Sequence, residues 1–127
     1  MSTSIYLVSS DEISTDDALS FLVDMHALDV EKDKVKGQIV EGEANVWINF
    51  LGVSVLKESN EEELEAWSDC LGVNPCSFFE LTIGKGEGSM ELAVKIARES
   101  MRRWRVVVDD LYDSVYNEES LNEILES

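Results

Sequence analysis

Carboxylates are the main side chains of this sequence that could bind a metal ion or catalyse a reaction. Asp109, Asp110 and Asp113 follow a run of valines, and Tyr112 and Tyr116 lie among and after them. Carboxylates clustered at the end of a strand can hold Mg²⁺ or Ca²⁺, whereas carboxylates flanked by tyrosines suit a protein interface. Because no further matched carboxylate or histidine accompanies them, we expect solvated or partner-contacting acids, with a metal site as the alternative.

A glycine-rich loop is the second candidate. Gly84, Gly86 and Gly88 lie between a predicted strand and a predicted helix, where backbone N–H groups often bind phosphate. Their spacing matches neither the dinucleotide-binding pattern nor the P-loop, because Ser89 stands where a third glycine is needed and Lys85 is misplaced. We therefore expect a plain connection, with Ser89 as the cap of the next helix.

The remaining reactive side chains do not form a catalytic set. His26 is the only histidine, and it falls on or near the apolar stripe of the first predicted helix. Nothing in the sequence ties Cys70 or Cys76 to it as a thiol–imidazole pair, and these three residues do not make a structural zinc site. The sequence therefore predicts no catalytic residue, no metal and no cofactor, and we expect a protein that is not an enzyme.

The charge of the chain is its most informative property. There are 27 acidic residues against 10 basic ones in 127 residues, a formal net charge of -17. A surface this negative repels nucleic acid and anionic membranes and attracts basic proteins. We therefore expect a protein partner of basic character and neither a nucleic-acid nor a membrane partner.

The acids gather in two places that could contact such a partner. One is a predicted helix with Asn60 and Glu63 as its capping box; the other is the Asp–Tyr segment described above. Complementary charge at such surfaces speeds association and suppresses wrong partners. The predicted contact residues are Glu61, Glu62, Glu65 and Asp69 on the helix, and Asp109, Asp110, Tyr112, Asp113 and Tyr116 in the segment.

Half of the basic residues lie in one short stretch. Lys95, Arg98, Arg102 and Arg105 recur at steps of three and four, which places them on one stripe of a helix, and Arg103 lies between them. An RNA-binding face is one interpretation, but the rest of the chain would oppose it. We expect these cations to pair with acids of the same domain.

Apolar periodicity predicts the elements that must position these side chains. The length is that of one domain, spanning residues 1–127. The fold class is α/β or α+β, with a single-layer sheet of about five strands and helices packed on one or both faces. The predicted strands are 5–8, 38–40, 44–51, 78–83 and 106–108, and the predicted helices are 16–28, 61–71, 89–104 and a short one at 121–125.

Two aromatic residues stand opposite the core-facing stripe of their strands. Val46, Ile48 and Phe50 share one face of a strand and Trp47 takes the other, while Phe78 alternates in the same way in its own strand. Either helices cover both faces of the sheet, or these aromatic side chains mark an adaptor surface or a homodimer interface. The sequence leaves the oligomeric state open.

The start of the chain has neither the basic residues nor the long apolar stretch of a secretory signal, and no segment has the roughly 20 apolar residues that span a bilayer. We expect a cytoplasmic protein in which Cys70 and Cys76 are reduced thiols.

Residues 76–116 carry a family resemblance. They run from a strand through the glycine loop and an arginine-rich helix to Trp104 and the sequence VVVDDLYDSVY. This stretch resembles the C-terminal half of small bacterial immunity proteins, including those that protect against contact-dependent growth-inhibition toxins. The resemblance implies a cytosolic, non-enzymatic inhibitor that binds a cognate toxin domain, often a nuclease. Since a nuclease must be cationic to hold its substrate, an acidic inhibitor would be its electrostatic complement; the alternative is a small metal-binding or adaptor protein.

Overall fold

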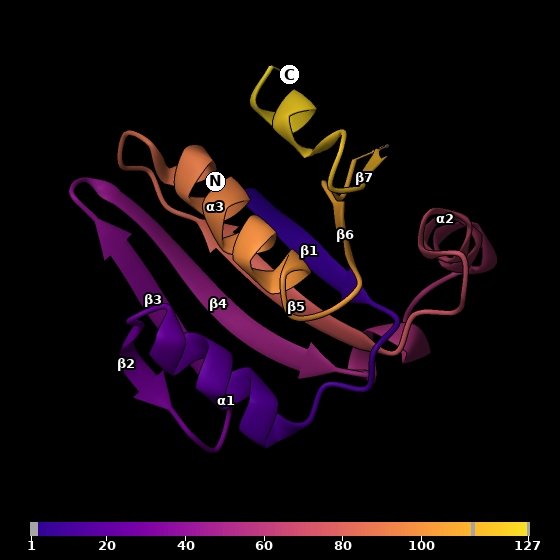
Figure 1. Cartoon of the computed structure of the whole chain (residues 1–127), viewed down its shortest axis with the longest axis horizontal. Helices are drawn as coiled ribbons and strands as arrows, with labels where there is room; N and C mark the ends of the chain where they lie inside the picture. The colour runs from indigo at the N-terminus through magenta and orange to yellow at the C-terminus, as the bar shows by residue number, and fades with distance from the viewer. Residues whose placement is uncertain (1–2, 113, 127) are drawn as a thin grey trace.

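An antiparallel sheet of seven strands is the frame of the computed structural model, which describes residues 3–112 and 114–126 (Figure 1). The order across the sheet is β2-β3-β4-β5-β1-β6-β7, and every neighbouring pair is antiparallel. The strands are β1 (Thr3–Ser9), β2 (Leu28–Glu31), β3 (Lys36–Glu41), β4 (Ala44–Gly52), β5 (Ser77–Ile83), β6 (Val106–Asp109) and β7 (Val115–Tyr116).

Local signals in the sequence fix most helix ends. The Ser14 hydroxyl accepts the Asp17 N–H at the start of the first helix. The predicted capping box of Asn60 and Glu63 is present, and Gly72 ends that helix in the left-handed conformation with φ of 83°. The α-helices are α1 (Thr15–Asp24), α2 (Glu61–Leu71) and α3 (Ser89–Met101), and the 3₁₀ helices are η1 (Ser54–Lys57) and η2 (Leu121–Leu125).

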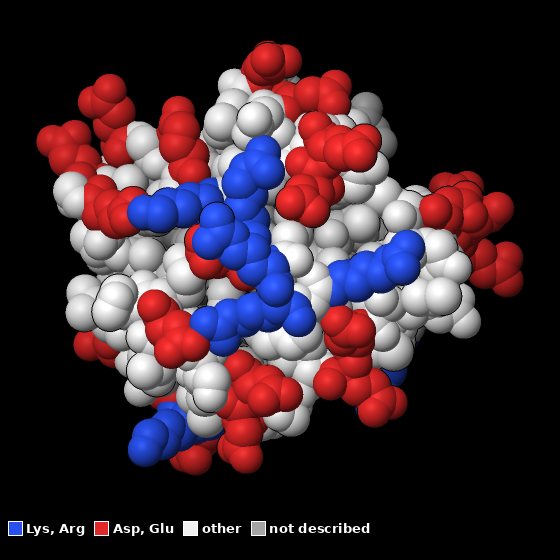
Figure 2. Space-filling view, in the orientation of Figure 1, with Lys and Arg blue, Asp and Glu red and all other residues white. Residues whose placement is uncertain are grey.

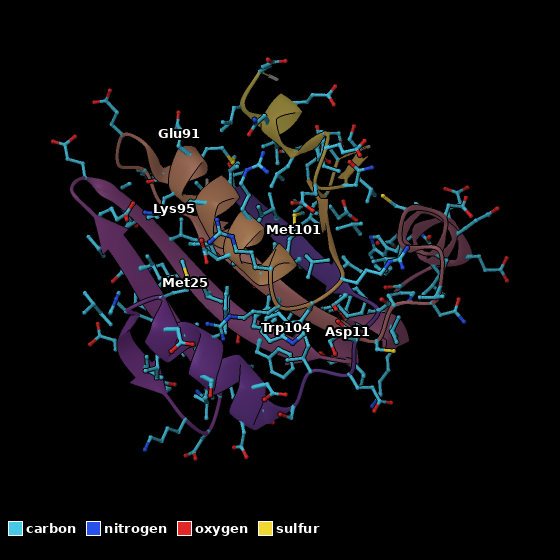
Figure 3. All side chains as sticks on the ribbon, in the orientation of Figure 1. Asp11, Met25, Glu91, Lys95, Met101 and Trp104 are labelled. Atoms are coloured by element: carbon cyan, nitrogen blue, oxygen red, sulfur yellow. The ribbon has the colours of Figure 1, made fainter. Side chains whose placement is uncertain are left out.

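One face of the sheet, which we call the front face, is covered by α1, α3 and η2. Figure 3 labels Trp104, which packs between the end of α3 and the sheet. Its ring stacks on Phe79 of β5 at a centroid distance of 5.8 Å and meets Phe21 of α1 edge-on at 5.4 Å. These aromatic contacts tie both helices to the middle of the sheet.

The opposite face, the back face, is covered at one end only. Val8, Phe78 and Val107 lie there beneath Trp67 and Leu71 of α2, together with side chains of η1. Figure 1 shows α2 standing apart from α1 and α3, beside β6 and β7. The back face therefore has a covered half and an open half.

The predicted class of mixed helix and sheet is confirmed, but the predicted number of about five strands is too low. The five predicted strands are all present, and β2 and β7 add one strand at each edge. β2 pairs irregularly with β3, and Asp29 within it has φ of 52°. Such short, charged edges carry little of the apolar alternation that identifies a strand in sequence.

Two further predictions about helix ends are wrong. The first helix ends at Asp24, not residue 28, and His26 follows it, exposed and with φ of 60°, off the apolar stripe. Ser89 is the first residue of α3 and does not cap it. Its hydroxyl accepts the Asn45 N–H at 3.0 Å and donates to the Gly86 carbonyl at 2.7 Å, which holds the glycine loop against the β3–β4 hairpin.

The glycine loop packs too tightly for side chains. A Cβ at Gly86 would come within 1.6 Å of the Glu43 carbonyl oxygen, and one at Gly84 within 1.9 Å of the Asn45 side chain. The glycines therefore permit close backbone approach to the hairpin, in agreement with a plain connection.

Candidate partner-binding surface

The acidic face of α2 carries charge that no described cation neutralises. Within residues 3–112 and 114–126, the ion pairs use Asp24, Glu31, Glu41 and Glu99, none of which lies on α2. Three acids in the first turn of α2 suit the positive end of the helix dipole. The predicted contact residues on this helix are all exposed: Glu61, Glu62, Glu65 and Asp69.

The basic residues of α3 and of the turn that follows it bond to other residues of the protein. Lys95 donates to Glu41 of β3 at 2.6 Å, Arg98 donates to Asn122 at 2.7 Å, and Arg103 pairs with Asp24 of α1. Figure 2 shows them as a blue band on the front side with red residues around it. The predicted pairing with acids of the same domain is confirmed for Lys95, for Arg103 and for Arg102, which pairs with Glu99 at 3.2 Å, whereas Arg98 bonds to an amide. Arg102, Arg103 and Arg105 lie beyond the end of α3, so the predicted single helix stripe is not present in full.

The two predicted acidic surfaces are joined by a hydrogen bond. The indole Nε1–H of Trp67, buried on α2, donates to the Asp109 Oδ2 at 2.7 Å, and the Asp109 Oδ1 accepts the Leu111 N–H at 2.7 Å. Trp67 was not among the predicted contact residues. A buried indole N–H needs an acceptor, but the sequence did not show that Asp109, in a distant segment, supplies it.

Asp110 shapes the turn after β6. Its Oδ1 accepts the N–H groups of Tyr112 and Ser114 at 2.9 and 3.2 Å, and the Tyr116 hydroxyl lies 3.4 Å from its Oδ2. Asp113 lies outside the described residues. No group of three or more His, Cys, Asp or Glu side chains that could hold a metal occurs in the part of the chain that the structure describes.

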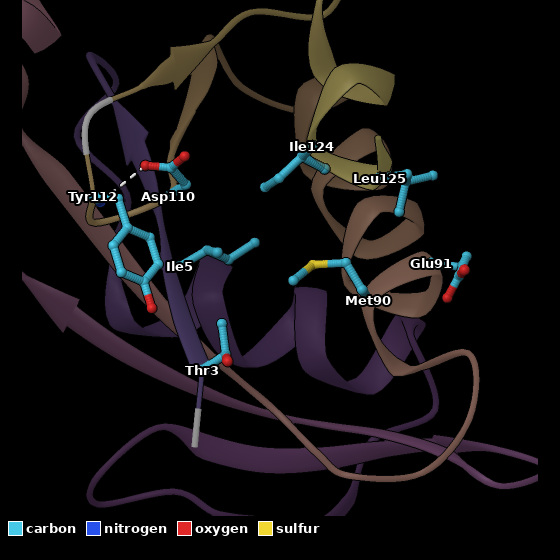
Figure 4. A pocket seen from close by; sticks show the side chains of 8 residues that line it. All are labelled: Thr3, Ile5, Met90, Glu91, Asp110, Tyr112, Ile124 and Leu125. Carbon is cyan, nitrogen blue, oxygen red and sulfur yellow. Dashed lines mark hydrogen bonds between the residues drawn. The ribbon is translucent and has the colours of Figure 1, made fainter. Parts of the chain in front are cut away.

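The tyrosines of this segment differ in availability. Tyr112 is 84% exposed, whereas Tyr116 is partly buried against the front core. Tyr112 lines a shallow hollow of about 310 Å³ with Ile5, Met90 and Leu125 (Figure 4). Of the two, only Tyr112 presents most of its ring to solvent.

The open half of the back face was not among the predicted contact residues. Its side chains form two cross-strand rows set by the register of β3, β4, β5 and β1. Trp47 is the largest of them and is 42% exposed, whereas Phe78, on the same side, is fully buried beneath α2. Of the two alternatives left open by the sequence, coverage by a helix therefore holds for Phe78 but not for Trp47. The rows are Gln38–Trp47–Thr82–Ser4 and Lys36–Asn49–Glu80–Tyr6.

The boundary between the covered and open halves of the back face carries several negative charges. Partial burial raises the pKa of the Tyr6 hydroxyl, and the negative charges of Glu80, Glu58, Glu63 and Asp109 raise it further. These carboxylates come from β5, the residue after η1, α2 and β6. The fold therefore directs acids from four parts of the chain toward one edge of the open face.

The surroundings of the Cys70 thiol do not activate it as a nucleophile. Cys70 and Cys76 are free and partly buried, and burial raises the pKa of the Cys70 thiol. A reactive cysteine needs the opposite shift, toward the thiolate.

Comparisons with known proteins found no matching family model, no matching curated protein and no matching solved structure. In the described residues, no helix has the length and apolar character needed to cross a membrane.

Proposed function

We propose that the protein is an immunity-type inhibitor, which binds and neutralises a basic, nuclease-like toxin domain in the bacterial cytoplasm. The observation that carries this proposal is the net charge of -17 together with the acidic face of α2, whose carboxylates make no ion pair with described residues. A cationic partner would supply the missing counter-charge and would be steered toward this surface during encounter.

The way in which the acids are held supports a binding role. The capping box fixes the start of α2, and the bond from Trp67 to Asp109 anchors the helix to β6. Side chains carried on anchored elements lose less conformational freedom on binding than those on mobile loops. The acidic surface is therefore preorganised for binding.

The experiment that tests this function begins with capture of the partner. The tagged protein is used at low salt to capture proteins from its own cells, and the bound protein is identified and purified. We expect one stoichiometric basic protein that stops growth when expressed alone and does not when this protein is co-expressed. A partner that is acidic, or a basic partner whose toxicity persists on co-expression, would contradict the proposal.

A variant of α2 in which three acidic side chains are replaced by neutral amides refines the test. Glu61→Gln, Glu62→Gln and Glu65→Gln together should slow association about tenfold and leave dissociation nearly unchanged, because exposed charges act mainly on encounter. The matched control replaces Glu12, Asp33 and Glu87, which are exposed elsewhere, by their amides. An equal slowing in both variants would mean that net charge, not the α2 surface, directs the encounter.

A further inference from the structure

In the open half of the back face, a large aromatic side chain stands without a covering element among the residues that the structure describes. Trp47 projects from β4 next to Thr82 of β5 and Gln38 of β3. The front side of the same strand is fully covered at Val46 and Ile48. A half-exposed tryptophan among short polar neighbours provides a flat apolar platform on a rigid strand.

A carboxylate stands diagonally across from this platform. Glu80 faces Asn49, two residues along β4 from Trp47, so the two side chains are diagonal neighbours on adjacent strands. Long side chains at such positions are within reach of one another, since their Cβ atoms are roughly 7–8 Å apart. Glu80 makes no ion pair with any described residue.

The charges around this platform define the kind of occupant. Glu80, Glu58, Glu63 and Asp109 all act on the Tyr6 hydroxyl, which adjoins Glu80 across the β1–β5 pair. The one basic residue in the two rows is Lys36, at the far edge, and it pairs with Glu31 at 3.8 Å. A cation that lay between Trp47 and Tyr6 would therefore meet Glu80 and the negative charges at this edge of the open face.

We propose that Trp47, Glu80 and Tyr6 form the docking site for an arginine side chain on a segment of the basic partner, a proposal that rests on the proposed function. A guanidinium can lie flat on the indole while its N–H groups pair with the Glu80 carboxylate. A lysine ammonium, a compact and strongly hydrated charge, gains less from such a flat platform. A second copy of this chain would bring the same carboxylates face to face, which like-charge repulsion opposes.

The first test uses a defined probe in place of the partner. A capped peptide of alternating glycine and arginine is titrated into the ¹⁵N-labelled protein, followed by backbone and indole N–H signals, with a glycine–lysine peptide of equal charge in parallel. We expect the arginine peptide to shift the Trp47 indole signal and the Glu80 and Thr82 amides, and to bind several-fold more tightly than the lysine peptide. Shifts concentrated on α2 or on residues 109–116, equal binding of the two peptides, or no saturable binding would overturn the proposal.

Substitutions then locate the contact. Trp47→Ala and Glu80→Gln should each weaken binding of the arginine peptide about tenfold, as expected for loss of a cation–π or charged contact. The matched controls are Val23→Ala and Asp33→Asn, at exposed positions on α1 and in the β2–β3 turn, and they should change the affinity less than twofold. Equal losses in the controls would contradict the site, as would Trp47 signals that shift with protein concentration alone, because the face would then pair with a second copy.

Binding measurements with the purified partner distinguish a failure of this docking site from a failure of the proposed function on which it rests. If Trp47→Ala and Glu80→Gln leave the affinity for a captured toxin unchanged while the triple α2 variant weakens it, the inhibitor function stands and the docking site is wrong. If no basic toxin exists but the arginine peptide binds at Trp47, the site stands and the function is wrong.

Discussion

The two faces of the sheet are built by the same alternation of side chains along the same strands, yet they meet different surroundings. On the front face, Ile48 and Leu81 are sealed beneath α1 and α3. On the back face, α2 and η1 cover Phe78 but leave Trp47 and Glu80 accessible to solvent. The comparison teaches that one face stabilises the fold throughout, whereas the other divides its residues between packing and recognition.

The charged side chains also differ between the two sides of the sheet. The cations of α3 and of the turn that follows it lie on the front side, and they are held by Glu41, Asp24 and Glu99 or by Asn122. The carboxylates of α2 and Glu80 have no such partners among the described residues. A basic protein that approaches from the back side therefore meets acids without the competing cations of the front side.

The largest expected effect tests the front face. Phe79→Ala removes a fully buried ring that contacts Phe21, Phe50 and Trp104, and we expect the free energy of unfolding to fall by about 3–5 kcal/mol. Urea denaturation followed by circular dichroism measures the loss. A change below about 1 kcal/mol would mean that the front core is not packed as described.

The next largest effect tests the hydrogen bond that holds α2 over the back face of the sheet. Trp67→Phe keeps an aromatic ring but removes the N–H that donates to Asp109, and we expect a loss of about 2 kcal/mol because a hydrogen bond to a charged group is removed. A double-mutant cycle with Asp109→Asn, also by urea denaturation, should give a combined loss smaller than the sum. Strict additivity would show that the two side chains do not interact.

A smaller effect tests the open half. Trp47→Ala removes a side chain that no helix covers, so we expect the free energy of unfolding to change by about 1 kcal/mol or less. The same variant should lose affinity for the arginine peptide, which separates recognition from stability. A loss as large as that of Phe79→Ala would show that the open half is structural.

The smallest effect concerns alkaline pH. Burial and then the negative charges around it raise the pKa of Tyr6 in the folded protein, so the neutral phenol is favoured there. Its stabilising contribution is complete below the unfolded pKa of about 10 and is lost as pH rises through the folded pKa. Between about pH 9 and about pH 11, the native protein should therefore lose more stability than Tyr6→Phe. If urea denaturation showed the same loss of stability in both proteins over this pH range, the raised pKa of Tyr6 would be contradicted.

Local patterns in the sequence predicted local structure well. The capping box at Asn60, the helix over 61–71 and the alternation around Trp47 each depend on residues a few positions apart, and each is present. Pairing and coverage depend on distant residues, which one sequence does not reveal. The order of the strands and the place of α2 over Phe78 rather than over Trp47 are of this kind.

For the candidate site, too, the sequence predicted the local features but not those that depend on distant strands. The acids of α2 could be found by counting charges, and Glu61, Glu62, Glu65 and Asp69 are exposed as a contact surface requires. The row that brings Glu80 beside Tyr6 comes from the pairing of β1 with β5, which lie far apart in the chain. A lone Glu in a strand gives no sign in sequence that its face remains uncovered.

The salt dependence of association with the purified basic partner is the decisive measurement of acidic steering. Stopped-flow mixing would give the association rate constant from about 50 mM to about 1 M salt, a range over which exposed charges become screened. An account based on acidic steering predicts that the rate falls at least about tenfold, with little change in dissociation. An association rate that stays constant across this range would contradict it.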